Sequence, residues 1–159
     1  MEILVDGKHV KLRYMKKPHI RNSVEANSEV IIFKSKSEDS AERLLDRWLS
    51  EKSISIISEI VVSKAREHGI EFSSIGLCRG TRWGSCSSKK ELKFNKYICM
   101  IPINIAEYVV AHELAHTRQL NHSRAFWEEV RRICPEYRAL RKELRNYDSY
   151  RREVFRKLE

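Results

Sequence analysis

Three histidines and a glutamate form the most chemically informative pattern in the sequence. His112-Glu113-Leu114-Ala115-His116 is followed by a further histidine, His122. Successive residues of an α-helix are rotated by about 100°, so His112 and His116 lie on one face, one turn apart, and can bind the same metal ion. Glu113 points to one side of that face, where it reaches a water molecule without binding the ion. The spacing predicts a metal site with an adjacent general base.

His122 can join this site only if the helix ends soon after His116. In a continuous helix, His122 would lie about 15 Å from His112 along the axis. We therefore predict a bend at residues 119–121, whose asparagine tolerates a left-handed backbone. Three histidine ligands with an open fourth position are typical of catalytic zinc. The pattern predicts one Zn²⁺ per chain and a hydrolase with Glu113 as its base.

The elements around the motif are predicted to bury it. Residues 105–115 are apolar on nearly all sides, which indicates a buried helix, and Asn104 with Glu107 fits a capping box at its start. A second helix is predicted after Ser123 and ends at Pro135. Its Phe126 and Trp127 are expected to form a wall behind His122.

The N-terminal part, about residues 1–36, is predicted to be β-rich. Segments 3–5 and 9–14 flank an Asp-Gly turn, and segments 20–26 and 29–34 form a second pair of strands. The helical and catalytic part, about residues 37–159, begins with a long amphipathic helix from Ser37 to Gly69. The sequence does not decide whether this helix is divided into two at residues 53–55. Residues 75–101 resemble a hairpin that leads into the metal helix. We expect a single α+β domain over residues 1–159.

Composition and charge indicate the cell compartment and the binding partners to expect. No apolar stretch is long and uninterrupted enough to span a membrane, and because residues 1–10 already have a strand pattern we expect no export signal. The four cysteines lack C-x-x-C spacing, so we expect a cytoplasmic protein with reduced thiols. The net charge is +9, and residues 131–159 contribute ten Lys/Arg against five Asp/Glu. This tail indicates either a solvated helix face or a site for nucleic acid or nucleotide phosphates.

Two sequence runs resemble a known family. TRWGSCSSKKELKFN and VVAHELAHTRQLNHSRAFW are similar to the YgjP-like metallopeptidase domain, which is related to the WLM and SprT-like zinc metalloproteases. The resemblance covers essentially the whole chain and implies a zincin-type metal helix with the same three histidine ligands and Glu113 as base. It also implies that Trp83, Gly84 and Ser85, in the hairpin signature, hold an extended substrate. The alternative for Trp83 is a side chain that packs in the core. The ligand spacing is similar to that of metzincins too, although Gln119 stands where they have glycine.

Three functions are consistent with these residues. A peptidase acting on a peptide or protein is first. A phosphoanhydride (nucleoside triphosphate) hydrolase is second, and its phosphate contacts would be Arg79, Arg82, Lys89 and Lys90. A nucleic-acid-associated binding module with a vestigial metal site is third, and the intact Glu113 argues against it.

The catalytic reaction also needs a group that stabilises developing negative charge. Arg82 is the first candidate for this catalytic role, and Tyr97 and Tyr108 follow it.

Overall fold

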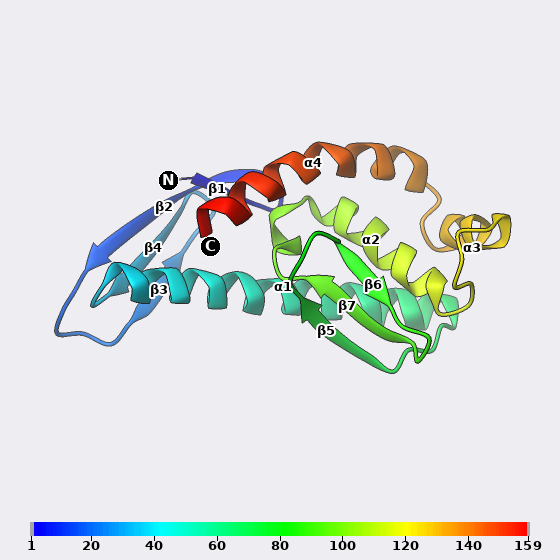
Figure 1. The fold of residues 1–159 in the computed structure, drawn as a ribbon, viewed down its shortest axis with the longest axis horizontal. Coiled ribbons are helices and arrows are strands. Elements are labelled where there is room, and N and C mark those ends of the chain that lie inside the picture. Colours follow the sequence, from blue (N-terminus) through cyan, green and yellow to red (C-terminus); the bar gives the residue numbers. More distant parts are fainter. Residues whose placement is uncertain (1, 159) are drawn as a thin grey trace.

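The fold is α+β, as predicted, with two small sheets arranged along one long helix (Figure 1). The computed structural model describes the backbone of residues 2–158 and their side chains except at 151 and 153–158. The elements follow in the order β1 (Glu2–Val5), β2 (Lys8–Lys16), β3 (Ser23–Ala26), β4 (Val30–Ser35), α1 (Glu38–His68), β5 (Ser74–Cys78), β6 (Gly84–Cys86), β7 (Glu91–Asn95), η1 (Ile98–Met100), α2 (Ile103–His116), α3 (Arg124–Ile133) and α4 (Tyr137–Leu158). None of the helices described is long and apolar enough to cross a membrane.

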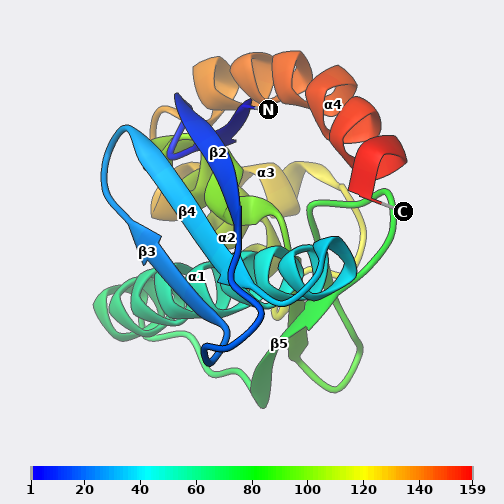
Figure 2. The ribbon, with the colours of Figure 1, turned by 90° about the vertical axis from the view of Figure 1, so that its left-hand side faces the viewer.

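The first sheet has the strand order β1-β2-β4-β3 and contains both predicted strand pairs. Its first turn is the expected Asp-Gly pair, with positive φ at Asp6 (51°) and Gly7 (70°), as a two-residue hairpin turn requires. A parallel pairing of β2 with β4 joins the two hairpins. One face of the sheet packs on the N-terminal half of α1 (Figure 2), burying Ile3, Val10, Ile31, Phe33, Leu45 and Leu49.

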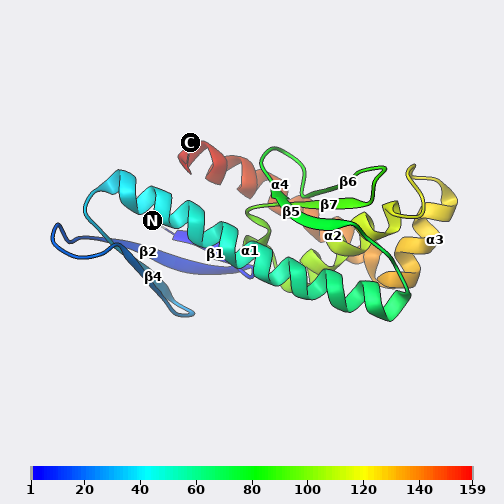
Figure 3. The same cartoon turned by 90° about the horizontal axis from the view of Figure 1, so that it is seen from below.

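Helix α1 is continuous and runs past both sheets (Figure 3). The Ser37 side chain caps its start, and Gly69 ends it in the left-handed conformation, as expected. The break left undecided at residues 53–55 does not occur. Ser53 is fully buried there, where its hydroxyl donates to the Lys96 carbonyl (2.7 Å) and accepts from the Cys99 amide (3.1 Å). A serine inside a helix thus holds the segment that precedes α2.

The second sheet has the order β5-β7-β6, and β6 lies at its edge. The predicted hairpin is present as the antiparallel pair β6–β7. The first strand of the predicted hairpin is instead two strands, β5 and β6. Strand β5 pairs with β7 in parallel and does not pair with β6. Leu92 and Phe94 of β7 are fully buried in the core that the sheet shares with α1 and α2. Strand β6 also packs against α2, which brings an edge strand beside the metal helix.

The predicted capping box at the start of α2 is wrong. The helix begins at Ile103, and among the described residues the Asn104 side chain accepts only from the adjacent amide of Ile105. The Asp6 carboxylate accepts the Ile103 amide instead, at 2.9 Å. Asp6 can reach this amide because the β1–β2 turn lies on Pro102, so closely that a Cβ at Gly7 would be 2.6 Å from the proline ring. Asp6, in the first turn of the first sheet, therefore caps α2, the helix that carries His112 and His116.

Helices α3 and α4 complete the domain around α2. Ser123 caps α3 through the Phe126 amide, and α3 ends before Pro135, as predicted. Helix α4 then returns across α2 towards the first sheet (Figure 1). Its Asp148 accepts the Trp83 indole N–H at 2.8 Å, and the Tyr150 hydroxyl accepts the Leu4 amide at 2.6 Å.

Candidate metal centre

The structure brings together the three histidines of the predicted metal site. His112 and His116 occupy the last two turns of α2, which ends at His116. The chain then bends, and His122 returns to the same place. One ring nitrogen from each histidine lies within 4.8 Å of the other two. The Nε2 atoms of His112 and His122 are 3.2 Å apart. This convergence is what a single ion with three imidazole ligands requires.

The bend after α2 is built differently from the prediction. Among the described non-glycine residues only Asp6 and Lys90 have positive φ, so Asn121 is not left-handed. The helix ends instead with the Thr117 hydroxyl donating to the Leu114 carbonyl at 2.7 Å. Nδ1 of His116 lies 2.9 Å from the carbonyl oxygen of Gln119. Because a carbonyl only accepts, Nδ1 carries the proton, which leaves Nε2 of His116 free to bind metal.

Aromatic rings of α3 hold the histidine rings in place. Phe126 is fully buried and stacks on His116, with ring centroids 4.4 Å apart. Trp127 stacks on His122 at 6.0 Å. The expected wall behind His122 is therefore present, and it limits how far the histidine side chains can turn.

Two of the three clustered histidines, His112 and His116, have a lowered pKa. Burial, and then the neighbouring His116 and His122, lower the pKa of His112 from 6.5 to about 3. Burial also lowers the pKa of His116. Both rings are therefore neutral at pH 7, the form that donates a lone pair to a metal.

Glu113 lies between the metal site and the edge strand. Its side chain is buried, and burial raises its pKa from 4.5 to about 8, opposed by the positive charge of Arg82. Gly84 of β6 is in close contact with it, since a Cβ at position 84 would lie 2.7 Å from Glu113 Cγ and Oε1. A glycine is needed here to leave room for the carboxylate.

The residues predicted to bind substrate or to stabilise negative charge differ in how far they are buried. Arg82 is exposed, and Ser85 is half-buried on β6. Trp83 is 8% exposed, in the core that surrounds α2. Tyr108 is also buried, with its ring edge-on to His112 at 6.1 Å, and burial raises its pKa to about 12. Tyr97 packs in the core of the first sheet, with residues such as Ile3 and Leu4.

One group of residues beside the site was not predicted from the sequence. The guanidinium of Arg141 on α4 lies over the Trp127 ring, 4.5 Å from its centroid. Tyr137, at the start of α4, stacks on the same indole at 5.6 Å. The available signal was the spacing of Arg138, Arg141 and Arg145, which places three cations on one face of a helix.

Comparison with known proteins gives a match to one family. The family described as YgjP-like, metallopeptidase domain, matches residues 1–147. No curated protein and no solved structure has a significant match to the chain. The match includes the first sheet as well as the histidine cluster, in agreement with the contact between Asp6 and α2. The chain belongs to the YgjP-like metallopeptidase-domain family.

Proposed function

We propose that the chain is a zinc-dependent peptidase in which Glu113 acts as the general base. The observation that carries the proposal is the buried carboxylate of Glu113, placed beside three convergent histidines and against an edge strand. A buried carboxylate without a paired cation is unfavourable unless the site uses it. Its position agrees with a role in moving a proton.

The donor set at the cluster fits zinc. His112, His116 and His122 offer imidazole nitrogens within 4.8 Å of one another, and no carboxylate of the described residues belongs to the group. Magnesium and calcium prefer oxygen ligands, whereas zinc binds three histidines in catalytic sites. Bound there, zinc polarises a scissile carbonyl and lowers the pKa of water to about 7.

The residues of the chain supply the remaining steps. Glu113 takes the proton of the attacking water and delivers it to the leaving amine. An extended peptide adds to β6, an outer strand of the second sheet, along the main chain of Trp83, Gly84 and Ser85. Arg82 is exposed, and its positive charge acts on Glu113. We therefore assign to Arg82 the stabilisation of the negative charge that develops in the transition state.

Comparing the zinc-loaded wild type with Glu113→Gln tests this proposal. Glutamine keeps the size of the side chain but cannot accept a proton. We expect cleavage in a fluorogenic peptide library by the wild type, a fall in kcat of about 10²–10⁴-fold in the variant, and unchanged zinc content. Cleavage at the wild-type rate by the zinc-loaded variant would show that Glu113 is not the base.

The same assay includes nucleoside triphosphates, since phosphoanhydride hydrolysis is the competing prediction. Two of its expected phosphate contacts, Lys89 and Lys90, lie in the turn between β6 and β7, and Arg79 pairs with Asp46 of α1 at 3.7 Å. Hydrolysis of triphosphates without cleavage of any peptide would replace the peptidase proposal.

A further inference from the structure

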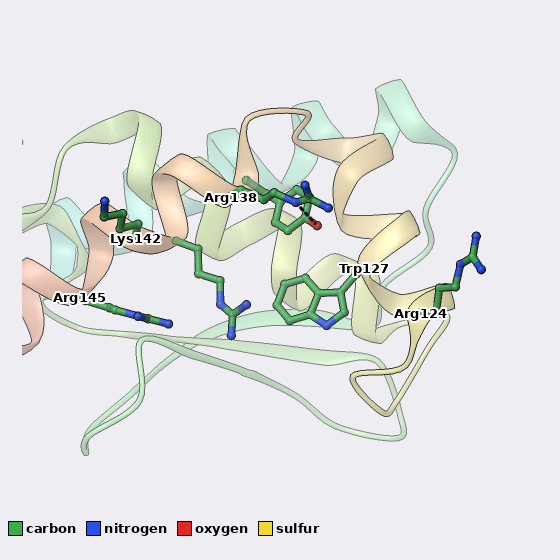
Figure 4. Close-up of a pocket in the computed structure, with 7 residues that line it drawn as sticks. Arg124, Trp127, Arg138, Lys142 and Arg145 are labelled. Atoms are coloured by element: carbon green, nitrogen blue, oxygen red, sulfur yellow. Dashed lines mark hydrogen bonds between the residues drawn. The ribbon is translucent and has the colours of Figure 1, made fainter.

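A basic pocket lies between α3 and α4 (Figure 4). Its volume is about 570 Å³, within the range of about 300–1,000 Å³ that is usual for ligand sites. The α3–α4 pocket is lined by Arg124, Trp127, Tyr137, Arg138, Arg141, Lys142 and Arg145. Five of these seven side chains are cationic and the other two are aromatic, so the pocket suits an anionic ligand.

Two of the arginines are held in place by aromatic rings. Arg141 lies over the Trp127 ring at 4.5 Å. Arg138 lies over the Tyr137 ring at 5.8 Å, and its Nε donates to the Tyr137 hydroxyl at 3.2 Å. The two rings stack on each other. Because these contacts restrict the guanidinium groups before a ligand arrives, binding loses less side-chain entropy.

Four of the five cations that line the pocket have no acidic partner among the described side chains. Within the described part of the chain, no carboxylate forms an ion pair with Arg138, Arg141, Lys142 or Arg145. Arg124 does pair with Glu128, at 2.9 Å, and Figure 4 shows it directed away from Arg138, Lys142 and Arg145. Unbalanced cations around one cavity attract an anion from solution.

The pocket and the metal centre share a wall. Trp127 lines the pocket and also stacks on His122, one of the three metal-site histidines. A ligand bound in the pocket therefore lies next to the place where a bond would be cleaved.

We propose that the α3–α4 pocket binds acidic side chains of the peptide substrate, on one side of the scissile bond. The proposal rests on the peptidase function proposed above and gives it a substrate class. Guanidinium groups bind carboxylates through pairs of parallel hydrogen bonds. Single-stranded nucleic acid requires free aromatic faces for its bases. The Trp127 ring instead stacks with Tyr137 and His122 and lies beneath Arg141.

Fluorescence anisotropy with a labelled hexaglutamate peptide tests the pocket. The protein is zinc-loaded Glu113→Gln, so that binding is measured without turnover. We expect hexaglutamate to bind more tightly than labelled hexaglutamine and than an oligothymidylate of equal charge. Replacing both Arg138 and Arg141 with alanine should weaken hexaglutamate binding at least about tenfold, because two charged hydrogen-bond donors are lost.

The controls separate the pocket from the overall charge and from folding. Lys8→Ala with Lys11→Ala removes two exposed cations from β2 and should leave hexaglutamate affinity unchanged. Zinc content and Tm verify that the arginine variant is folded. If it is not, Lys142→Ala with Arg145→Ala alters two exposed positions of the same pocket and should weaken binding several-fold.

Three results would overturn the proposal. They are no binding of hexaglutamate, binding that is insensitive to the pocket variants, and tighter binding of oligothymidylate that the pocket variants abolish. The last result would assign the pocket to nucleic acid. Each of these results is a binding affinity and not a rate of cleavage, so failure of the pocket and failure of the peptidase function are distinguishable.

Discussion

Gly84 and Glu113 are in direct contact: a Cβ atom at position 84 would lie within 2.7 Å of both Cγ and Oε1 of the glutamate. The backbone of the edge strand β6 therefore borders the carboxylate proposed as the base. Since the glutamate is on α2 with two of the metal-site histidines, the distance from β6 to the metal centre depends on this contact. The position of one glycine links the strand proposed to hold substrate with the group proposed to move a proton.

Gly84→Ala is expected to retain zinc and lose activity. The methyl group must displace Glu113, and a displacement of about 1 Å at a reacting group lowers kcat by on the order of 10²-fold. Gly76→Ala is the matched control, because a Cβ there meets no atom within 4 Å. Peptide hydrolysis and zinc content are measured for both variants. Equal kcat values for the two would show that the contact has no catalytic importance.

His116→Ala is expected to lower the zinc content from one ion per chain to a small fraction of that. The variant removes one of three ligands and leaves the other two too weak to retain the ion against a chelator. His19→Ala, at an exposed position in the first sheet's connecting loop, is the control and should keep its zinc. Elemental analysis after dialysis gives the result. Full occupancy in His116→Ala would remove this histidine from the site.

The stability of the metal-free protein should depend on Glu113 in a defined pH window. Burial raises the pKa of Glu113 in the folded state from 4.5 to about 8. The folded state therefore keeps a proton that the unfolded state releases. The stability contributed by the protonated form is fully present below about pH 4.5 and is lost as the pH rises through the folded value of about 8.

Glu113→Gln has no such titration, so the metal-free variant should become more stable than the wild type as the pH rises from 5 to 8. The expected difference at pH 8 is a few kcal/mol, on the order given by the change in pKa. The lowered pKa of His112 acts alike in both proteins and cancels in the comparison. Urea unfolding in the presence of a chelator, at several pH values, measures the difference in unfolding free energy between the two proteins. Parallel pH profiles would contradict the burial of an uncharged Glu113.

Asp6→Ala is expected to destabilise the protein by about 1 kcal/mol through loss of the cap on α2. For a chain of this size the corresponding fall in Tm is about 2–4 °C. Asp6→Asn is the control, because asparagine also accepts a hydrogen bond and tolerates the positive φ of 51° at this position. Thermal unfolding of both variants distinguishes the cap from the charge. An unchanged Tm in Asp6→Ala would show that the Ile103 amide needs no protein partner.

The features predicted correctly from the sequence are those with local signals. His112 and His116 share a helix face by periodicity alone, and Ser37 and Ser123 mark helix starts through their own side chains. His122 was placed by the length of a helix that could not otherwise bring it back. Each of these inferences uses residues close together in the chain.

The features that were missed depend on contacts between distant residues. Asn104 has the local pattern of a cap, but Asp6 takes that position because the β1–β2 turn packs on Pro102. The parallel pairing of β5 with β7 and the fully buried Ser53 likewise depend on tertiary packing. In the sequence Arg141 is one of many cations, and only the packing of α4 against Trp127 distinguishes it.

The hydrogen bond from Leu4 to Tyr150 has a consequence for the order of folding during synthesis. Its two partners are separated by 146 positions in the chain. At about 5–20 residues per second, a ribosome needs about 7–30 s to make the intervening segment. All three histidines are synthesised before α4, so they can meet a metal ion in the nascent chain before that helix packs against α2.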